Sequence, residues 1–563
     1  MRVRYCYGTG ASDSPAPTPE GIIRIVSRRA ILLLSCALLP AFVPAGAVAQ
    51  SGTTRAPTAK APTAKAPTAG KAPTRATVAR PTVASVAKRP APRKAPARTA
   101  IRAATTVSDN ALRAHFTSLV GSATNSGNWG VMVVSLTRGD TVFAHNADLL
   151  LLPASTMKLY TSAVALDRFG PAHQFKTEVL RDGMVSPEGV VLGNIVLKGA
   201  GDPSLSPRYT GWNVGVRPLD SIADQVAKMG IKHVRGDVIG DASAFDSERV
   251  PAGWRTRYLQ ASYAARVSAL SFNENLAHIT VRPSTRGAVV AFGQQVSGLS
   301  LRNTVTVRPN SRGASIRVWQ DTLTQQFRVS GWIGAQAKVR TYQVVVEQPE
   351  RYVAAAFRAA LEARGITVGG VVRTGEAAGN AVRVTTWASP PLAQLIATMN
   401  GESNNHFAEL LFRNASRTET SVGSAHIANE SLRTFLTDRV GADPAAVYAA
   451  DGSGLSTLDR VTARSMVQLL GYTAAAPWGE VLRSSLPLAG RTETLRRRMR
   501  STAAQGNLRA KTGTTNDVTS LGGYVTAKDG EQLAFSFIYN GRDLWRARAA
   551  IDAMGVTLAS FSR

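Results

Sequence analysis

The sequence predicts a fold of mixed α and β structure, because strand-like and helical patterns both occur after residue 108. Two apolar runs, 130–136 and 140–144, are separated by a short turn containing Arg-Gly, which is typical of a hairpin. A helical pattern follows from 150 to about 168. Near the C-terminus, the runs 518–526 and 532–539 flank Lys-Asp-Gly, a second hairpin signal. Strands at both ends of this region therefore enclose helical segments.

The composition allows a large hydrophobic core, and about half of the net positive charge lies in the first 108 residues, before the predicted folded part. The chain has 563 residues, 44% of them hydrophobic, which is enough for several domains. Its formal net charge is +29, and this suggests an anionic partner. Residues 1–49 carry +3 and residues 50–108 carry +12, which leaves +14 for the following 455 residues. The predicted folded part is thus only moderately basic, which weakens a nucleic-acid interpretation.

Cysteine and histidine usage excludes several kinds of site. Both cysteines, Cys6 and Cys36, precede the folded part, which leaves it without a disulfide, a thiolate metal site or a cysteine nucleophile. The histidines are scattered, with no HExxH motif and no close pair. We therefore expect no catalytic zinc.

The N-terminus is predicted to be a signal peptide, residues 1–49. Arginines, among them Arg28 and Arg29, precede an apolar run at 31–43, and Ala47-Val48-Ala49 fits a cleavage site before Gln50. The Arg28-Arg29 pair also fits a twin-arginine signal, so the export route stays open. No later segment reaches the roughly 18 apolar residues of a membrane helix. We therefore expect an exported, soluble protein that is periplasmic, extracellular or associated with the cell wall.

Residues 50–108 are predicted to form a disordered basic spacer. Ala-Pro-Thr-Ala-Lys units occur at 56–60 and 61–65, and Lys, Arg, Pro and Ala dominate the rest. Such a segment lacks the side chains for a core, and its prolines favour an extended chain. It also lacks the aromatic residues on which single-stranded nucleic acid stacks. We therefore expect a tether with affinity for anionic envelope polymers, and no specific nucleic acid.

A first candidate motif, Ser-x-x-Lys, lies at Ser155 and Lys158. The predicted helix puts the two residues one turn apart on the same face, where the amine can reach the hydroxyl. A buried amine beside another cation can lose its proton and act as the base for a serine nucleophile. Ser85 and Lys88 repeat the pattern within the spacer, so only the context of hairpin and helix distinguishes the first pair.

A second candidate motif is Ser403-Asn404-Asn405, between helical patterns at 392–399 and 406–413. A tight corner between two helices would direct its side chains into a cleft. The same Ser-x-Asn pattern begins at Ser108, Ser126 and Ser271, and an N-cap for the following helix is an equally good interpretation of the motif alone.

The third candidate motif is Lys511-Thr512-Gly513-Thr514. It precedes the C-terminal hairpin, so it is predicted to lie on the first strand of a meander. Backbone groups of such a strand can pair with an extended peptide. Gly513 would allow another part of the chain to approach closely.

In this order, Ser-x-x-Lys, Ser-x-Asn and Lys-Thr-Gly resemble the motifs of penicillin-interacting serine hydrolases. The 248 positions from Ser155 to Ser403 make the chain similar to one branch, the D-alanyl-D-alanine carboxypeptidase/endopeptidase family of low-molecular-mass penicillin-binding proteins. Further similar segments lie at 197–205, 236–241, 267–275 and 451–456. One departure is Thr-Glu-Thr-Leu at 492–495, where the family usually has Asp-Gly-Thr-Leu.

The resemblance implies an α/β (α+β) fold, in which a penicillin-binding-protein transpeptidase-like domain has helices on an antiparallel sheet and is interrupted by a large β-rich insertion. We expect a catalytic domain from 109–185 plus 388–563. An inserted domain would span 186–275 plus 346–387, and a nested β-rich domain would span 276–345.

The resemblance also implies the role of each site residue. Ser155 would attack the carbonyl between two D-alanines, or a D-alanyl cross-link, and form an acyl-enzyme that water hydrolyses. Lys158 would be the base for acylation, and Ser403 and Lys511 would pass a proton to the leaving amine. Substrate would be bound by Asn405, Thr512, Gly513 and Thr514, and the backbone N–H groups of Ser155 and Thr514 would form the oxyanion hole.

These implied roles need no metal or organic cofactor, and they define the expected partners, which are peptidoglycan peptides as substrates and β-lactams as inhibitors. Two alternatives remain open at this point. A β-lactamase has the same three motifs, and the basic spacer would also suit an inactive module that binds the cell wall or nucleic acid.

Overall fold

The described part of the chain comprises residues 110–123, 127–209, 217–418 and 420–563 of a computed structural model. The predicted signal peptide and spacer lie outside these residues. Within them, no helix is long and apolar enough to cross a membrane.

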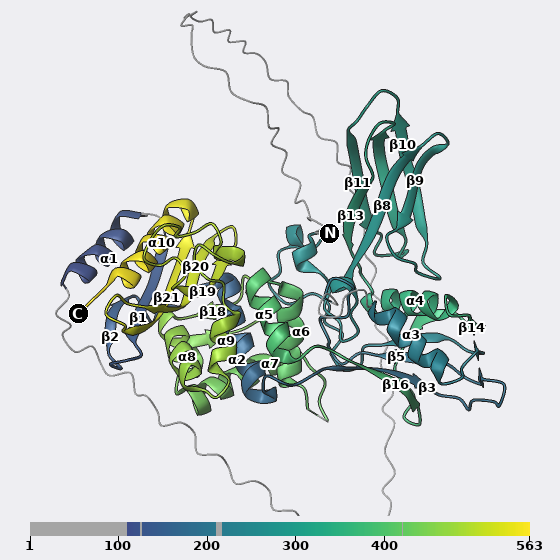
Figure 1. The fold of residues 1–563 in the computed structure, drawn as a ribbon, viewed down its shortest axis with the longest axis horizontal. Helices are drawn as coiled ribbons and strands as arrows, with labels where there is room; N and C mark the ends of the chain where they lie inside the picture. Colours follow the sequence, from purple (N-terminus) through teal and green to yellow (C-terminus); the bar gives the residue numbers. More distant parts are fainter. Residues whose placement is uncertain (1–109, 124–126, 210–216, 419) are drawn as a thin grey trace, which may run out of the picture. The chain divides into compact units, whose positions relative to one another are not determined.

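A five-stranded antiparallel sheet joins the two ends of the described chain (Figure 1). Its strand order is β19-β20-β21-β1-β2. The N-terminal hairpin consists of β1 (Gly127–Ser135) and β2 (Thr141–His145), and the C-terminal strands are β19 (Arg509–Thr514), β20 (Val518–Thr526) and β21 (Gln532–Gly541). Strand β1 pairs with β21 along its whole length, from Gly127 opposite Gly541 to Ser135 opposite Leu533. The strands predicted at both ends are thereby confirmed.

Helices cover both faces of this sheet. Because side chains alternate along a strand, Val131 and Val133 of β1 pack into the cluster formed with α1 (Asn110–Ala123) and α10 (Leu544–Ser560). Met132 and Val134 pack into the opposite cluster, together with residues of α2 (Met157–Phe169), α5 (Leu392–Glu402), α6 (Asn405–Ser416), α7 (Ala425–Phe435) and α8 (Ala463–Ala475). Figure 1 shows α10 on one face and α8 on the other. Burial on both faces explains why β20 and β21 are apolar along most of their length.

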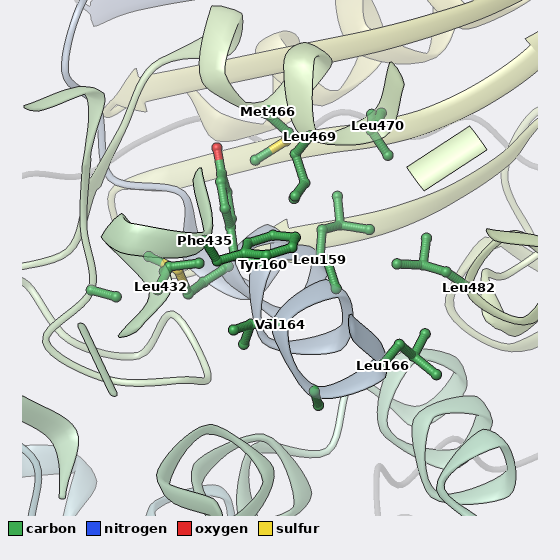
Figure 2. Packing of buried hydrophobic residues seen from close by; sticks show 14 of the residues in the cluster. Leu159, Tyr160, Val164, Leu166, Leu432, Phe435, Met466, Leu469, Leu470 and Leu482 are labelled. Carbon is green, nitrogen blue, oxygen red and sulfur yellow. The ribbon is translucent and has the colours of Figure 1, made fainter. Parts of the chain in front are cut away.

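Helix α2 (Met157–Phe169) is the central element of the second cluster. Ten consecutive residues from Met157 to Leu166 are buried. Figure 2 shows Leu159, Tyr160 and Val164 of this helix among side chains of α7 (Ala425–Phe435) and α8 (Ala463–Ala475). The Tyr160 hydroxyl lies 2.8 Å from Ser465 Oγ, so its polar end is also satisfied. This packing fixes the position of the residues that precede the helix.

A second five-stranded sheet lies in the region between the first two motifs. Its strands, in spatial order, are β15 (Val372–Thr374), β7 (Val238–Asp241), β5 (Ile195–Lys198), β3 (Lys176–Arg181) and β16 (Val382–Ala388). Strands β5, β7 and β15 are parallel, and β3 is antiparallel to β5 and β16. Strand β3 (Lys176–Arg181) thus pairs with strands of the insertion, although the predicted boundary at 185 assigned it to the catalytic part. The domain boundaries as a whole remain a prediction.

Residues 276–345 form two three-stranded sheets, β10-β12-β11 and β13-β8-β9. The insertion contains β4 (Val190–Val191), β5 (Ile195–Lys198), α3 (Pro218–Lys228), β6 (His233–Val234), β7 (Val238–Asp241), β8 (Leu276–Ser284), β9 (Gly287–Phe292), β10 (Leu301–Arg308), β11 (Ala314–Gln320), β12 (Phe327–Gly334), β13 (Arg340–Val345), α4 (Pro349–Glu362), β14 (Thr367–Val368), β15 (Val372–Thr374) and β16 (Val382–Ala388). The elements that follow it are α5 (Leu392–Glu402), α6 (Asn405–Ser416), β17 (Val447–Tyr448), β18 (Arg460–Val461) and α9 (Gly479–Ser485).

Candidate active site

Ser155 lies in a short 3₁₀ turn, Ala154–Thr156, immediately before α2. The predicted helix start at 150 is wrong: Leu151 instead forms a bridge with Val461, and the α-helix begins at Met157. Pro153 explains the difference, because proline disfavours a helical conformation in the residue before it. Ala154 has a φ of 48°, a strained value for a non-glycine residue, directly before the half-buried serine.

Lys158 is fully buried beneath this turn and contacts the serine. Its Nζ lies 3.0 Å from Ser155 Oγ, 2.7 Å from Asn405 Oδ1 and 2.7 Å from the carbonyl oxygen of Ser453. Burial lowers the pKa of Lys158 to about 8, although three buried acids, Asp451, Glu409 and Asp459, act in the opposite direction. The lysine is therefore close to the range in which it can accept a proton at neutral pH.

Asp451 organises the loop that supplies the carbonyl group to Lys158. Its buried carboxylate accepts hydrogen bonds from the backbone N–H groups of Ser453, Gly454 and Ser456, at 3.0, 2.6 and 2.7 Å. It also accepts a hydrogen bond of 2.7 Å from the indole of Trp254, a residue of the insertion. The sequence pattern at 451–456 marked this loop as similar to the family but did not assign it a role.

Two glycines allow this loop and the third motif to approach the serine. A Cβ at Gly454 would lie 1.8 Å from the carbonyl oxygen of Ala154, and its φ is 82°. A Cβ at Gly513 would lie 2.1 Å from Ser520 Oγ and 2.7 Å from the carbonyl oxygen of Pro153. Side chains at these positions would push the backbone away from the turn that carries Ser155.

The second motif forms the predicted corner between two helices. Helix α5 ends at Glu402, Ser403 takes a left-handed conformation with a φ of 57°, and α6 begins at Asn405. Asn404 also caps α6, because its Oδ1 accepts a hydrogen bond from the backbone N–H of Phe407 at 3.1 Å. The corner and the N-cap, which were alternative interpretations of the sequence, are therefore both present.

Lys511 joins the third motif to the second. Its side chain is fully buried, and Nζ lies 2.8 Å from Ser403 Oγ and 2.9 Å from the carbonyl oxygen of Thr512. Burial, and then the charge of Lys158, lowers the pKa of Lys511 well below its ordinary value. The structure thus contains two contacts between a buried lysine and a half-buried serine, and Asn405 touches the first of them.

Strand β19, which carries the third motif, is the first strand in the sheet order. Thr514 is exposed, and Thr512 donates a hydrogen bond of 3.2 Å to the hydroxyl of Thr494. Thr494 belongs to the segment that departs from the family pattern. There Glu493, at the position where the family pattern has glycine, has a positive φ of 38°, which is strained for a non-glycine residue.

Among the other Ser-x-Asn matches, the one at Ser271 lies wholly within the described residues, and it does not join this group. Ser271 donates a hydrogen bond of 2.7 Å to the carbonyl oxygen of Ser268, and Asn273 accepts one of 2.9 Å from Ser206. Ser85, Ser108 and Ser126 lie outside the described residues. Within the described ranges, no group of three or more His, Cys, Asp or Glu side chains is arranged to hold a metal ion.

A small pocket adjoins the turn that carries Ser155. Tyr258 and Arg255 of the insertion line one side, and Arg255 forms a 2.6 Å ion pair with Asp517. The remaining lining residues are Leu152, Ala154, Gly454, Leu455, Ser456, Thr457, Thr515 and Val518. Both the insertion and the strands of the first sheet therefore form the surroundings of the serine.

Comparison with known proteins identifies the fold and then the family. The crystal structure of penicillin binding protein 4 (dacB) from Haemophilus influenzae matches with a TM-score of 0.66 at 24% identity, covering 79% of this chain and 98% of that one. The chain therefore has a penicillin-binding-protein fold, as the motifs predicted.

A family model described as D-Ala-D-Ala carboxypeptidase 3 (S13) matches residues 117–561. The D-alanyl-D-alanine carboxypeptidase of Actinomadura sp. (strain R39) is 33% identical over 449 residues, which cover 77% of this chain and 81% of that one. The D-alanyl-D-alanine carboxypeptidase DacB of Haemophilus influenzae is 25% identical over 432 residues, which cover 74% and 85%. The chain belongs to the D-Ala-D-Ala carboxypeptidase 3 (S13) family.

Proposed function

We propose that this protein is a serine-type D-Ala-D-Ala carboxypeptidase, endopeptidase or both, which cleaves peptidoglycan stem peptides and cross-links through an acyl-enzyme on Ser155. The observation that carries the proposal is the pair of contacts between a buried lysine and a half-buried serine, Lys158 with Ser155 at 3.0 Å and Lys511 with Ser403 at 2.8 Å. Family membership supports the same reaction and favours it over an inactive binding module.

In the proposed acylation step, neutral Lys158 accepts the proton of the Ser155 hydroxyl while Oγ attacks the carbonyl carbon of the penultimate D-alanine. The lowered pKa of Lys158 supports this role, because a useful fraction of the amine is then unprotonated near neutral pH. Asn405 and the Ser453 carbonyl hold the amine in contact with the hydroxyl.

Ser403 and Lys511 are proposed to protonate the leaving amine. The Ser403 hydroxyl would donate its proton to the departing D-alanine nitrogen and receive one from Lys511, which lies 2.8 Å away. Water would then attack the acyl-enzyme and release the shortened peptide, while Lys158 returns its proton to Ser155 Oγ and a proton of the water restores Lys511. The depressed pKa of Lys511 favours loss of its proton in this step.

Substrate binding is proposed to use strand β19 as a template for an extended peptide. Thr512 and Thr514 would bind the terminal carboxylate, Gly513 would permit its close approach, and Asn405 would bind a substrate amide. The backbone N–H groups of Ser155 and Thr514 would stabilise the oxyanion, each contributing about 3–4 kcal/mol to transition-state binding.

We further propose that the protein is exported, acts in the periplasm or cell wall, and is inhibited by β-lactams. A related protein, penicillin binding protein 4 of Haemophilus influenzae, has a structure in complex with a β-lactam. The basic spacer at 50–108 is proposed to bind anionic envelope polymers.

The proposed function is tested by incubating the mature protein with a peptide that ends in D-Ala-D-Ala and measuring D-alanine release. A dimeric, cross-linked peptide tests the endopeptidase activity in parallel. The lifetime of the penicillin adduct then separates the peptidase from a β-lactamase: many minutes are expected, and turnover within seconds would favour a β-lactamase. A protein that neither releases D-alanine from the first peptide nor splits the dimeric peptide into monomers would contradict the proposal.

A further inference from the structure

Three consecutive residues of the insertion, Asn273, Glu274 and Asn275, have left-handed backbone conformations, with φ values of 52°, 58° and 57°. None is a glycine, so each is strained. Surrounding hydrogen bonds hold the segment: Ser206 Oγ donates to Asn273 Oδ1 at 2.9 Å, and Asn275 Nδ2 donates to the carbonyl oxygen of Arg266 at 2.8 Å. Because the neighbouring hydrogen bonds hold this strained segment in place, they also fix the position of the Glu274 side chain between Asn273 and Asn275.

The Glu274 carboxylate contacts the corner that carries Ser403. Its Oε2 accepts a 2.8 Å hydrogen bond from Asn404 Nδ2. Its Oε1 accepts hydrogen bonds of 2.6 Å from both Arg208 and the Tyr209 hydroxyl. Burial by itself raises the pKa of Glu274, but Tyr209 and Arg208 hold it below its ordinary value, so the carboxylate is ionised at neutral pH.

These contacts fix the Asn404 side chain at both ends. Its oxygen caps α6 through the N–H of Phe407, and its nitrogen donates to Glu274 and, at 3.2 Å, to the Tyr209 hydroxyl. The Tyr209 ring packs against Phe407 with 4.9 Å between centroids. Rotation of the corner would break this network, which includes atoms of both the insertion and α6.

We propose that Glu274 is a positioning residue, which acts through Asn404 to hold Ser403 and Asn405 in their reactive geometry. The inference rests on the proposed function, and it means that the insertion completes the active site from outside the catalytic sheet. The backbone carbonyl of Tyr263, also in the insertion, helps to hold the same corner, because it accepts a 2.9 Å hydrogen bond from Asn405 Nδ2.

The test exchanges donor and acceptor across this contact. Asn404→Asp keeps the oxygen that caps α6 but sets a second carboxylate against Glu274, so we expect the acylation rate constant for penicillin to fall about tenfold or more. In the double variant Asn404→Asp with Glu274→Gln, the glutamine amide can donate to the new carboxylate. We expect this variant to recover acylation to within about threefold of the wild type.

Glu531→Gln is the matched control. Glu531 is also a buried acid paired with arginine, since its Oε1 lies 2.7 Å from Arg563, but the pair lies at the β20–β21 turn, which joins the ends of the strands away from Thr514. This variant should melt at a lower temperature yet acylate at the wild-type rate. Loss of stability alone is therefore distinguished from loss of positioning.

Each outcome decides the proposal. Wild-type acylation in Asn404→Asp, or a double variant that folds but acylates no faster than Asn404→Asp, would overturn it. If Asn404→Asp does not fold, Glu274→Gln alone decides, with a loss of about threefold or more expected because the amide cannot accept all three hydrogen bonds. A wild-type protein that is not acylated at all would instead overturn the proposed function.

Discussion

The proposed role of Lys511 requires a compact amine that can lose its proton. Its amine is buried between Ser403 Oγ and the carbonyl oxygen of Thr512, at 2.8 and 2.9 Å. Lys511→Arg keeps the positive charge but replaces a compact amine with a planar fork that does not release its proton. We expect acylation by penicillin and kcat/KM for the peptide to fall together by about a hundredfold or more, with the fold retained.

Stopped-flow acylation and a melting curve check this expectation. Near wild-type acylation in Lys511→Arg would reduce the role of Lys511 to attraction of the substrate carboxylate.

The lowered pKa of Lys158 predicts how the acylation rate depends on pH. Its pKa is lowered from 10.5 to about 8, chiefly by burial. Only the neutral amine can accept the Ser155 proton, so the acylation rate constant should rise with pH through about 8 and then level off. A rate that stays flat from about pH 6 to pH 9 would show that Lys158 is not the base.

The same pKa shift has a consequence for stability. Between about 8 and 10.5 the unfolded chain binds more protons at this lysine than the folded chain does. The contribution of Lys158 therefore opposes folding at neutral pH, and this opposition declines as the pH rises through that window.

At the scale of elements, the 451–456 loop packs so closely against the turn before α2 that there is no room for a side chain at Gly454. A Cβ at Gly454 would lie 1.8 Å from the carbonyl oxygen of Ala154, so Gly454→Ala must displace one of the two segments. We expect loss of most penicillin acylation together with a lower melting temperature.

Gly530→Ala is the control for this substitution. Gly530 also has a positive φ, of 90°, but a Cβ there meets open space. It should cost about 1–2 kcal/mol of backbone strain and leave acylation unchanged. Equal acylation in the two variants would contradict the close approach at Gly454.

The sequence predicted those elements whose pattern is local. The strands of both hairpins follow from apolar runs and turn residues, and the Ser403 corner from two helical patterns separated by a short break. The helix start at 150 was mispredicted because the leucines at 150–152 look helical, although Pro153 was a signal against it. Strand β3 gives no local sign that it pairs with β5 and β16 of the insertion.

The candidate site was also predictable only in part, because some of its contacts join residues that are far apart in the sequence. The side chains that the chemistry requires, Ser155, Lys158 and Lys511, occur in short motifs. Glu274 and Trp254 reach the site from the insertion, 130 and 197 positions away from the residues that they contact. Such contacts depend on tertiary packing and leave no periodic signal in the sequence.

At the scale of the whole molecule, the spacer is proposed to be separable from catalysis. Deletion of residues 50–106 removes no motif residue, so turnover of a small D-Ala-D-Ala peptide should be unchanged. Retention on an anionic polymer should weaken, and the difference from the full-length protein should shrink toward 1 M salt, where the screening length is about 3 Å. Loss of small-peptide turnover on deletion would contradict a tether.

The proposed reaction depends above all on Ser155, held by Lys158, as the nucleophile. The most direct measurement is labelling of the mature protein with a fluorescent penicillin, followed by proteolysis and mapping of the labelled peptide, with Ser155→Ala beside it. We expect a label on the peptide that contains Ser155. We expect none on Ser155→Ala, whose stability should change by less than about 1 kcal/mol because only a half-buried hydroxyl is removed. A label on another serine, or a labelled Ser155→Ala protein, would contradict this role of Ser155.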